Sequence, residues 1–155
     1  MLMYYINQCD FVKQAEKSYI CRIVFNCKLE KINKFRRRSI RVMNLNRILI
    51  TAPSSGSGKT LITCGIMEAL KRRKMKVGAF KCGPDYIDPM FHKKVLNIPS
   101  KNLDSFMADE NTLKYLFKSQ AEQVDISVIE GVMGYYDGLS FDDTKASTYE
   151  VAKIT

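Results

Sequence analysis

Apolar residues in the last two thirds of the chain fall alternately into short continuous runs and into segments with helical spacing. The short runs are rich in Ile and Val, which is typical of buried strands of a parallel sheet. They lie at residues 47–51, 76–80 and 124–129. Between them, residues 60–74 and 109–119 repeat apolar side chains at the spacing of one helical face. The order predicts an α/β fold, with a mostly parallel sheet and helices on both faces.

The first 42 residues differ from the remainder in charge and punctuation. The chain has a net charge of +9, and residues 1–42 contain 10 Lys/Arg and 3 Asp/Glu but no Gly or Pro. Residues 43–155 hold the other 15 basic and 13 acidic side chains. We expect a basic N-terminal arm over 1–42, outside the native domain if Met43 is the true start. The arginines at 36–38 fit either a nucleic-acid contact or a solvated arm, and the balanced remainder argues against nucleic acid.

Length and composition indicate one soluble domain. The chain has 155 residues, and no apolar run approaches the ~20 residues needed to cross a bilayer. No secretory signal is predicted. The five cysteines form no CxxC pair, so we interpret them as reduced thiols of a cytoplasmic protein.

A phosphate-binding loop is predicted between the first strand and the first helix. Gly56 and Gly58 let the backbone N–H groups turn inward toward an anion at a helix N-terminus. Lys59 is expected at the β- and γ-phosphates of ATP, and Thr60 at Mg²⁺. Proline stands where the common pattern has its first glycine, so the loop is a variant. The expected nucleotide-binding residues are Ser55, Gly56, Ser57, Gly58, Lys59, Thr60 and Leu61.

Three acidic residues follow strands at the same predicted edge of the sheet. Asp85 and Asp88 come after the second strand, and Glu130 ends the third. Unpaired carboxylates repel one another, so together with the phosphate loop they favour a Mg²⁺–nucleotide site. Each acid taken alone fits a turn-stabilising or helix-capping role equally well.

The segment 130–138 places three glycines around Tyr135 and Tyr136. Such a loop suits stacking on a flat or large ligand, and ordinary surface packing explains the tyrosines equally well. Asp137 is a fourth candidate acid in this segment.

Taken together, these segments resemble the cobyrinic acid a,c-diamide synthase family, relatives of dethiobiotin synthetase and cobyric acid synthase. The likeness covers residues 46–155. It rests on APSSGSGKT (52–60), FKCGPDYIDPMFH (80–92), PSKNLDSFM (99–107), VIEGVMGYYDGL (128–139) and KASTYEVAKIT (145–155). The resemblance implies a P-loop NTPase-like α/β fold over 43–155, incomplete at its C-terminus.

The resemblance also implies a reaction. Mg²⁺–ATP phosphorylates a substrate carboxylate, and ammonia displaces phosphate to form an amide on the a and c side chains of cobyrinic acid. The implied metal residues are Thr60, Asp85 and Glu130, and the implied catalytic residues are Lys59, Asp88 and Asp137. The implied substrate residues are Lys81, Tyr86, Asn102, Asp104, Tyr135 and Tyr136. His92, the only histidine, is expected to support its loop and not to do acid–base chemistry.

Members of this family continue into a domain that hydrolyses glutamine, and this chain is expected to lack it. We therefore expect at best ammonia-dependent activity. Two alternatives stay open: amidation of another tetrapyrrole such as nickel sirohydrochlorin, or a non-catalytic nucleotide-binding fragment whose basic arm binds nucleic acid.

Overall fold

A computed structural model describes residues 45–140 and 142–155, so the expected arm over 1–42 lies outside the described residues. Strands and helices alternate along the described chain. They are β1 (Arg47–Ile50), α4 (Lys59–Arg72), β2 (Val77–Cys82), α5 (Ile87–Lys94), β3 (Ser100–Leu103), α6 (Glu110–Ala121), β4 (Ile126–Glu130) and α7 (Thr148–Ile154). No helix in this part of the chain is long and apolar enough to span a bilayer.

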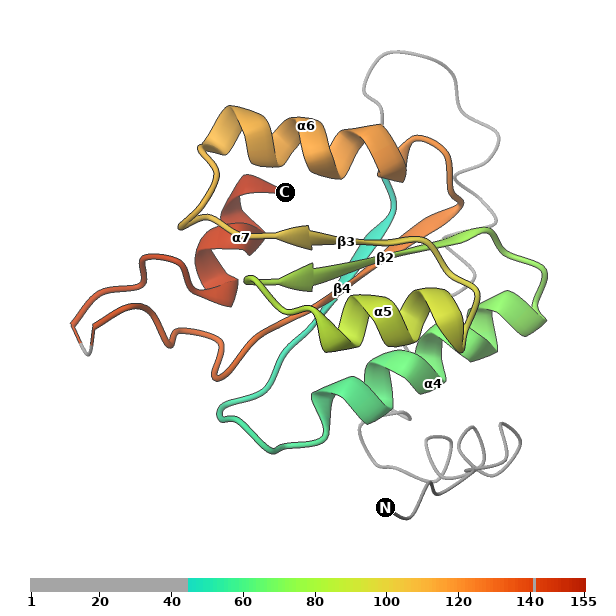
Figure 1. The fold of residues 1–155 in the computed structure, drawn as a ribbon, viewed down its shortest axis with the longest axis horizontal. Helices are drawn as coiled ribbons and strands as arrows, with labels where there is room; N and C mark the ends of the chain where they lie inside the picture. The colour runs from blue at the N-terminus through green and yellow to red at the C-terminus, as the bar shows by residue number, and fades with distance from the viewer. Residues whose placement is uncertain (1–44, 141) are drawn as a thin grey trace. The chain divides into compact units, whose positions relative to one another are not determined.

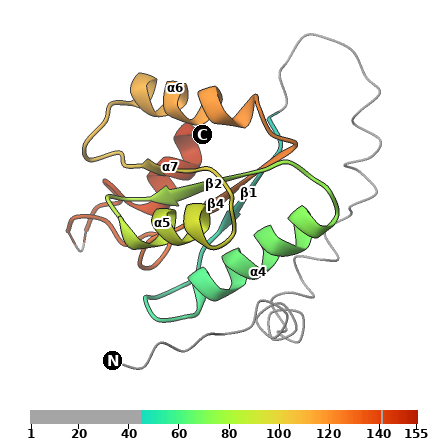
Figure 2. The ribbon, with the colours of Figure 1, turned by 45° about the vertical axis from the view of Figure 1, so that its right-hand side comes forward.

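The four described strands form one parallel sheet in the order β1-β4-β2-β3. Helices α4 and α5 lie on one side of this sheet and α6 on the other (Figure 1), and the turned view separates the same layers (Figure 2). Helix α7 packs with α6, since Val151 joins the cluster of buried residues that α6 covers. The predicted α/β fold with helices on both faces is confirmed.

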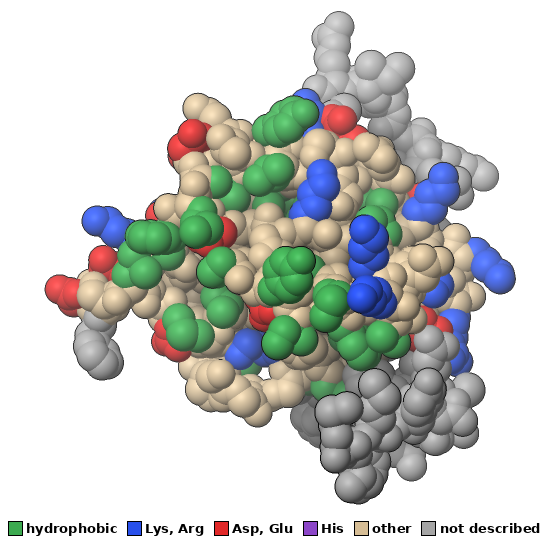
Figure 3. Space-filling model, in the orientation of Figure 1, with side chains coloured by type: hydrophobic (Ala, Val, Ile, Leu, Met, Phe, Trp, Pro, Cys, Tyr) green, Lys and Arg blue, Asp and Glu red, His purple; other side chains and the backbone are tan. Residues whose placement is uncertain are grey.

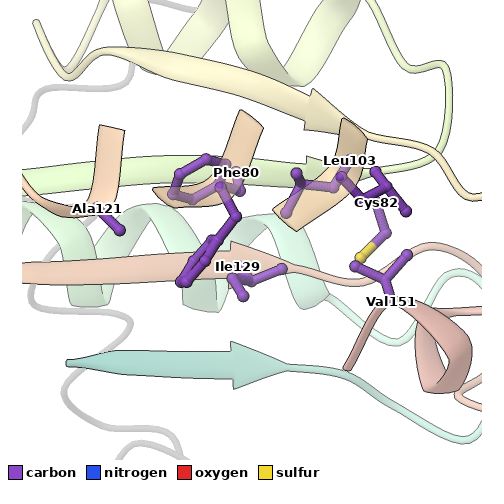
Figure 4. Packing of buried hydrophobic residues seen from close by; sticks show 8 residues of the cluster. Phe80, Cys82, Leu103, Ala121, Ile129 and Val151 are labelled. Atoms are coloured by element: carbon purple, nitrogen blue, oxygen red, sulfur yellow. The ribbon is translucent and has the colours of Figure 1, made fainter. Parts of the chain in front are cut away.

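The main hydrophobic core lies between the sheet and helices α6 and α7 (Figure 4). Because side chains alternate along a strand, Phe80 and Cys82 of β2 face this core while Lys81 faces α4 and α5. The rings of Phe80 and Phe117 lie 5.1 Å apart between centroids. The core residues are Phe80, Cys82, Leu103, Leu113, Phe117, Ala121, Ile129 and Val151.

The sequence patterns predicted neither strand β3 nor helix α5. Strand β3 has the polar sequence SKNL and pairs, within the described residues, with β2 alone, and edge strands tolerate polar residues that central strands do not. Helix α5 begins at Ile87, so Pro89 lies in its first turn, where the helix needs no N–H from it. Strand β2 extends to Cys82 and not only to Phe80, which carries Lys81 into a fully buried strand.

Candidate functional site

The phosphate loop joins β1 to α4, as predicted. Gly56 and Gly58 have φ angles of 73° and 79°, in the left-handed region that favours glycine. A Cβ atom at either position would meet nothing within 4 Å, so the space over the loop is open. Gly58 is the N-cap of α4 and provides no side-chain hydrogen bond to the first turn. The free N–H groups and the open space fit a bound phosphate.

Lys59 lies over its own loop and not among the acidic residues. Its Nζ donates to the Ser54 carbonyl oxygen at 2.8 Å, and the Ser57 hydroxyl donates to the same oxygen at 2.9 Å. Ser55 is exposed, and Leu61 is partly exposed on α4. Lys59 Nζ therefore lies over the loop, within reach of a phosphate bound to the N–H groups of the loop.

Lys81 and Glu130 form the centre of a buried charged cluster under this loop. The two residues are paired across β2 and β4, and both side chains point to the face covered by α4 and α5. Lys81 Nζ lies 3.0 Å from Glu130 Oε1, 2.6 Å from Asp88 Oδ2 and 3.6 Å from Asp85 Oδ2. The three predicted acids do converge. From the sequence we expected a metal ion to compensate their charge, and Lys81 provides part of that compensation.

Thr60 connects the phosphate loop to this cluster. Its hydroxyl donates to Glu130 Oε1 at 2.5 Å and lies 3.4 Å from Asp88 Oδ2. Burial alone raises the pKa of Glu130, but contacts with His92 and Thr60 and the charge of Lys81 outweigh it and leave that pKa below its ordinary value. Burial likewise lowers the pKa of Lys81, yet Asp88 and Glu130 raise it above the ordinary value. Both groups are therefore charged at neutral pH.

The donor set fits a Mg²⁺ ion that also binds phosphates and water. Three carboxylates around one ammonium leave an excess of negative charge next to Thr60. Within residues 45–140 and 142–155, no three His, Cys, Asp or Glu side chains are grouped so as to hold a metal ion by themselves. Mg²⁺ commonly takes one or two carboxylates and completes its shell with water and phosphate oxygens.

Asp85 also performs the capping role that its position allows. Its Oδ1 accepts from the N–H of Ile87 at 2.9 Å and of Asp88 at 3.3 Å, at the start of α5. Asn102, at the end of β3, donates its amide N–H to the Asp85 carbonyl at 2.6 Å. Asn102 thus braces the loop that carries the acids, and its side chain is engaged by the backbone.

His92 contacts the charged cluster, which its sequence position alone did not indicate. It is fully buried on α5, and its Nε2 lies 3.4 Å from Glu130 Oε2. Its other ring nitrogen, Nδ1, lies 3.1 Å from the Ser100 hydroxyl. The available signal was its spacing: a residue four positions after Asp88 shares its helical face once α5 is known to be a helix.

The loop after β4 packs against the phosphate loop. The N–H of Tyr135 donates to the Ala52 carbonyl at 3.0 Å, and Gly134 lies directly against the Pro53 carbonyl. The Asp137 carboxylate accepts from the N–H of Gly134 at 2.7 Å, and in the described structure it forms no ion pair with Lys81. Asp137 is thus placed as the stabiliser of a turn beside the phosphate loop.

Tyr135 and Tyr136 form a cluster of rings with Tyr149 of α7. The centroids of Tyr135 and Tyr136 are 4.7 Å apart, and Tyr149 lies 5.7 Å and 5.2 Å from them, respectively. Lys153 Nζ lies 5.4 Å from the Tyr149 ring centroid. Tyr149 and Lys153 lie in the segment 145–155 that contributed to the family resemblance, but neither was predicted as a site residue. Packing among the tyrosines is observed, and Tyr136 still exposes 62% of its surface.

Apolar side chains are exposed on the loops after β2 and β3. Tyr86 is 83% exposed, and Phe106 and Met107 are also well exposed. Asp104 accepts from the N–H of Phe106 through Oδ1, while its Oδ2 is buried without a hydrogen-bond partner in the described residues. On the face of the molecule that Figure 3 shows, hydrophobic side chains lie across the centre and left, and most of the visible Lys and Arg lie toward the right. Tyr86 and Asp104 thus lie on the loops after two neighbouring strands, and Tyr86 is exposed to solvent whereas Asp104 is partly buried.

The two described cysteines are buried and free. Burial, with smaller contributions from nearby charges, raises the pKa of the Cys64 thiol and of the Cys82 thiol to about 12. Both are therefore protonated at neutral pH and poor nucleophiles. The interpretation as reduced thiols is confirmed for these two, and Cys9, Cys21 and Cys27 lie outside the described residues.

The close packing of Gly134 leads to a testable prediction. A Cβ atom there would lie 2.6 Å from the Pro53 carbonyl oxygen and 2.7 Å from Asp137 Oδ2. We expect Gly134→Ala to lower the free energy of unfolding by about 1–3 kcal/mol, because two backbone segments must separate. Urea unfolding of the variant measures this, with exposed Leu139→Ala in the same loop as control. Equal stability of the two variants would contradict the prediction.

Comparison with known proteins places the chain among nucleotide-binding domains. Residues 48–139 match the family model described as the CobQ/CobB/MinD/ParA nucleotide binding domain. A cobyrinate a,c-diamide synthase of Listeria monocytogenes serotype 4b (strain F2365) is 54% identical over 112 residues, covering 72% of this chain and 25% of that relative. Proteins of the same name from Saccharolobus solfataricus and Thermoplasma acidophilum are 51% and 45% identical over 111 and 113 residues. They too are covered over 25% of their length, by 72% and 73% of this chain. The chain therefore spans about a quarter of the length of these curated relatives.

Proposed function

Because this chain belongs to the CobQ/CobB/MinD/ParA nucleotide-binding domain family, we propose that residues 43–155 bind Mg²⁺–ATP as the amidoligase part of a cobyrinate a,c-diamide synthase. The observation that carries the proposal is the open phosphate loop beside a buried, net negative cluster of acids. A nucleotide phosphate and a divalent ion together complement the charges of these two features.

Each part of the proposed site has a separate task. The N–H groups of the phosphate loop and the Lys59 ammonium hold the β- and γ-phosphates. Thr60 and Glu130 would hold Mg²⁺, with Asp85 as a further candidate ligand. The ion, when bound, neutralises charge on the transferring phosphoryl group.

The proposed reaction joins a carboxylate to ammonia in two steps. A carboxylate oxygen of the substrate attacks the γ-phosphorus, and the bond from that phosphorus to the bridging oxygen breaks to release ADP. Ammonia then attacks the acyl carbon, and inorganic phosphate leaves with the former carboxylate oxygen. Lys81, which forms an ion pair with Asp88 in the structure, is the proposed cation next to the substrate carboxylate. Asp88 and Asp137 are the candidate catalytic acids.

Three tyrosines are the proposed surface for the substrate. Tyr86 and Tyr136 are exposed and Tyr135 is partly buried beside Tyr136, and a flat macrocycle could stack on these rings. Asn102 of β3 and Asp104, directly after β3, are the other proposed substrate residues. We propose glutamine as the source of the nitrogen in a full-length protein of this family, with ammonia as the species that attacks the acyl phosphate.

Removing Lys59 is expected to abolish the response of the domain to nucleotide. A ligand that binds only the native state at 100 times its Kd stabilises it by about 2.7 kcal/mol. For a domain of this size, the thermal midpoint should therefore rise by about 10 °C with Mg²⁺–ATP. Lys59→Ala should remove that rise while leaving the midpoint without ligand nearly unchanged, because within residues 45–140 and 142–155 the hydrogen bond of Nζ is to the Ser54 carbonyl alone.

Exposed Lys114→Ala on α6 is the matched control and should keep the full rise. An equal rise in Lys59→Ala would overturn the nucleotide site. Deletion of residues 1–42 should leave the rise intact if the native domain begins at Met43. ADP release with ammonia and cobyrinic acid, compared with nickel sirohydrochlorin, then tests the substrate.

A further inference from the structure

His92 and Glu130 are two buried polar side chains, and each directs toward the other an atom without a hydrogen-bond partner in the described structure. Both are 0% exposed, and His92 Nε2 lies 3.4 Å from Glu130 Oε2. Neither atom has a hydrogen-bond partner within the described residues. Buried polar atoms rarely remain unpaired, and here each is the nearest available complement of the other.

The ring and the backbone of His92 each contact the segment that leads into β3. Its Nδ1 lies 3.1 Å from the Ser100 hydroxyl at the start of β3, and its backbone carbonyl accepts from the N–H of Ile98 at 3.0 Å. One turn earlier on α5, Asp88 contacts Lys81 and Thr60. Helix α5 therefore presents one residue to each end of the Lys81–Glu130 pair.

We propose that His92 is a positioning residue for Glu130. An N–H on Nε2 directed at Oε2 pairs both unpaired atoms, while Nδ1 accepts from the Ser100 hydroxyl. This fixes the carboxylate with Oε1 toward Thr60 and Lys81, the side on which the nucleotide-bound metal ion is proposed. The inference rests on the proposed function for its consequence, though not for the hydrogen bond itself.

The hydrogen on Nε2 can be observed directly, because His92 is the only histidine of the chain. A long-range ¹H–¹⁵N correlation spectrum of the unmodified protein therefore contains one imidazole, without assignment. We expect hydrogen on Nε2, and a shift of that signal in Glu130→Gln. An imidazole without hydrogen on Nε2 would overturn the proposal, whatever the outcome for nucleotide binding.

The consequence for metal binding is measured with Mn²⁺ as the probe, by electron paramagnetic resonance in the presence of ATP. His92→Asn keeps a polar group near Ser100 but cannot reach Glu130, whereas His92→Gln can place an N–H near the position of Nε2. Loss of a group that orients a ligating carboxylate commonly costs 10–100-fold in metal affinity. We expect about a 10-fold loss in His92→Asn and recovery of most of it in His92→Gln.

Three results separate the possibilities. Mn²⁺ affinities equal to the parent in both variants would overturn the positioning role, as would equal losses in both. A parent protein with no ATP-dependent Mn²⁺ binding would contradict the proposed function, and the imidazole spectrum would still decide where the hydrogen of His92 lies. Thermal unfolding without ligand identifies a variant that fails to fold, in which case the spectrum of the parent and of Glu130→Gln remains the test.

Discussion

Replacing Lys81 by Met is expected to lower the free energy of unfolding by about 3–5 kcal/mol at pH 7, the cost of leaving a buried ion pair without one partner. Lys81 contacts three carboxylates, of which Glu130 is completely buried. Met fills a similar volume, so the loss comes from charge and not from a cavity. Urea unfolding at constant temperature gives the difference, and exposed Lys114→Met should change stability by less than about 0.5 kcal/mol.

The pH dependence of this difference has a definite sign. The pKa of Glu130 lies below its ordinary value of 4.5, so the ionised carboxylate contributes stability above pH 4.5 that is lost as pH falls through the lowered pKa. In Lys81→Met the pKa of Glu130 should be higher than in the parent, because burial still raises it and the charge and hydrogen bond of Lys81 no longer lower it, so the carboxylate takes up its proton at higher pH. The gap between parent and Lys81→Met should therefore be largest near neutrality and shrink in acid. A gap that stays constant from pH 7 to pH 4 would show that the charge of Lys81 is not its cause.

Phe80→Ala is expected to be as destabilising for a different reason. Phe80 is fully buried in the centre of the core, and its ring packs against Phe117 of α6 (Figure 4). Truncation removes that contact and leaves a cavity between sheet and helix, at a typical cost of about 3–5 kcal/mol. Since domains are stable by only about 5–15 kcal/mol, the variant should lose a large share of the parent stability.

The matched control for Phe80→Ala is Tyr115→Ala, which removes an exposed aromatic ring from α6. Tyr115 is 71% exposed, so its loss should be small. Denaturant titration should show a lower midpoint for Phe80→Ala with an unchanged slope. If both variants unfold at the same denaturant concentration, the packing between β2 and α6 is not what stabilises the domain.

The central strands could be predicted because burial on both faces leaves a continuous apolar run. Strands β2 and β4 are buried at every residue and have this signature. Strand β1, an edge strand of the described sheet, has a short apolar run as well, and the α/β class follows from the alternation of these three strands with helices. Strand β3 has no such run, because an edge strand needs fewer apolar residues. Helix α5 was not predicted, because the glycine–proline pair before it indicated a turn and the residues that follow were interpreted as a continuation of that turn. The family resemblance, which rested on whole motifs, is confirmed by the matches to cobyrinate a,c-diamide synthases.

The site could be predicted as a set of residues, though not as a network. Parallel strands deliver their following loops to one edge, so the convergence of Thr60, Asp88 and Glu130 follows from the fold class. That Lys81 faces Glu130 depends on the register between β2 and β4, which no local pattern reveals. The contact of His92 depends in turn on α5 being a helix.

The strand order has a consequence for how the protein is made. Strand β1 pairs with β4, Arg47 lying opposite Ser127, so the phosphate loop is anchored to the last of the described strands. At about 5–20 residues per second, a ribosome needs roughly 4–16 s to travel from one of these residues to the other. For most of that interval the nascent chain contains the whole loop but lacks β4, the neighbour of β1 among the described strands. Nucleotide binding is therefore expected to appear only after β4 has left the exit tunnel.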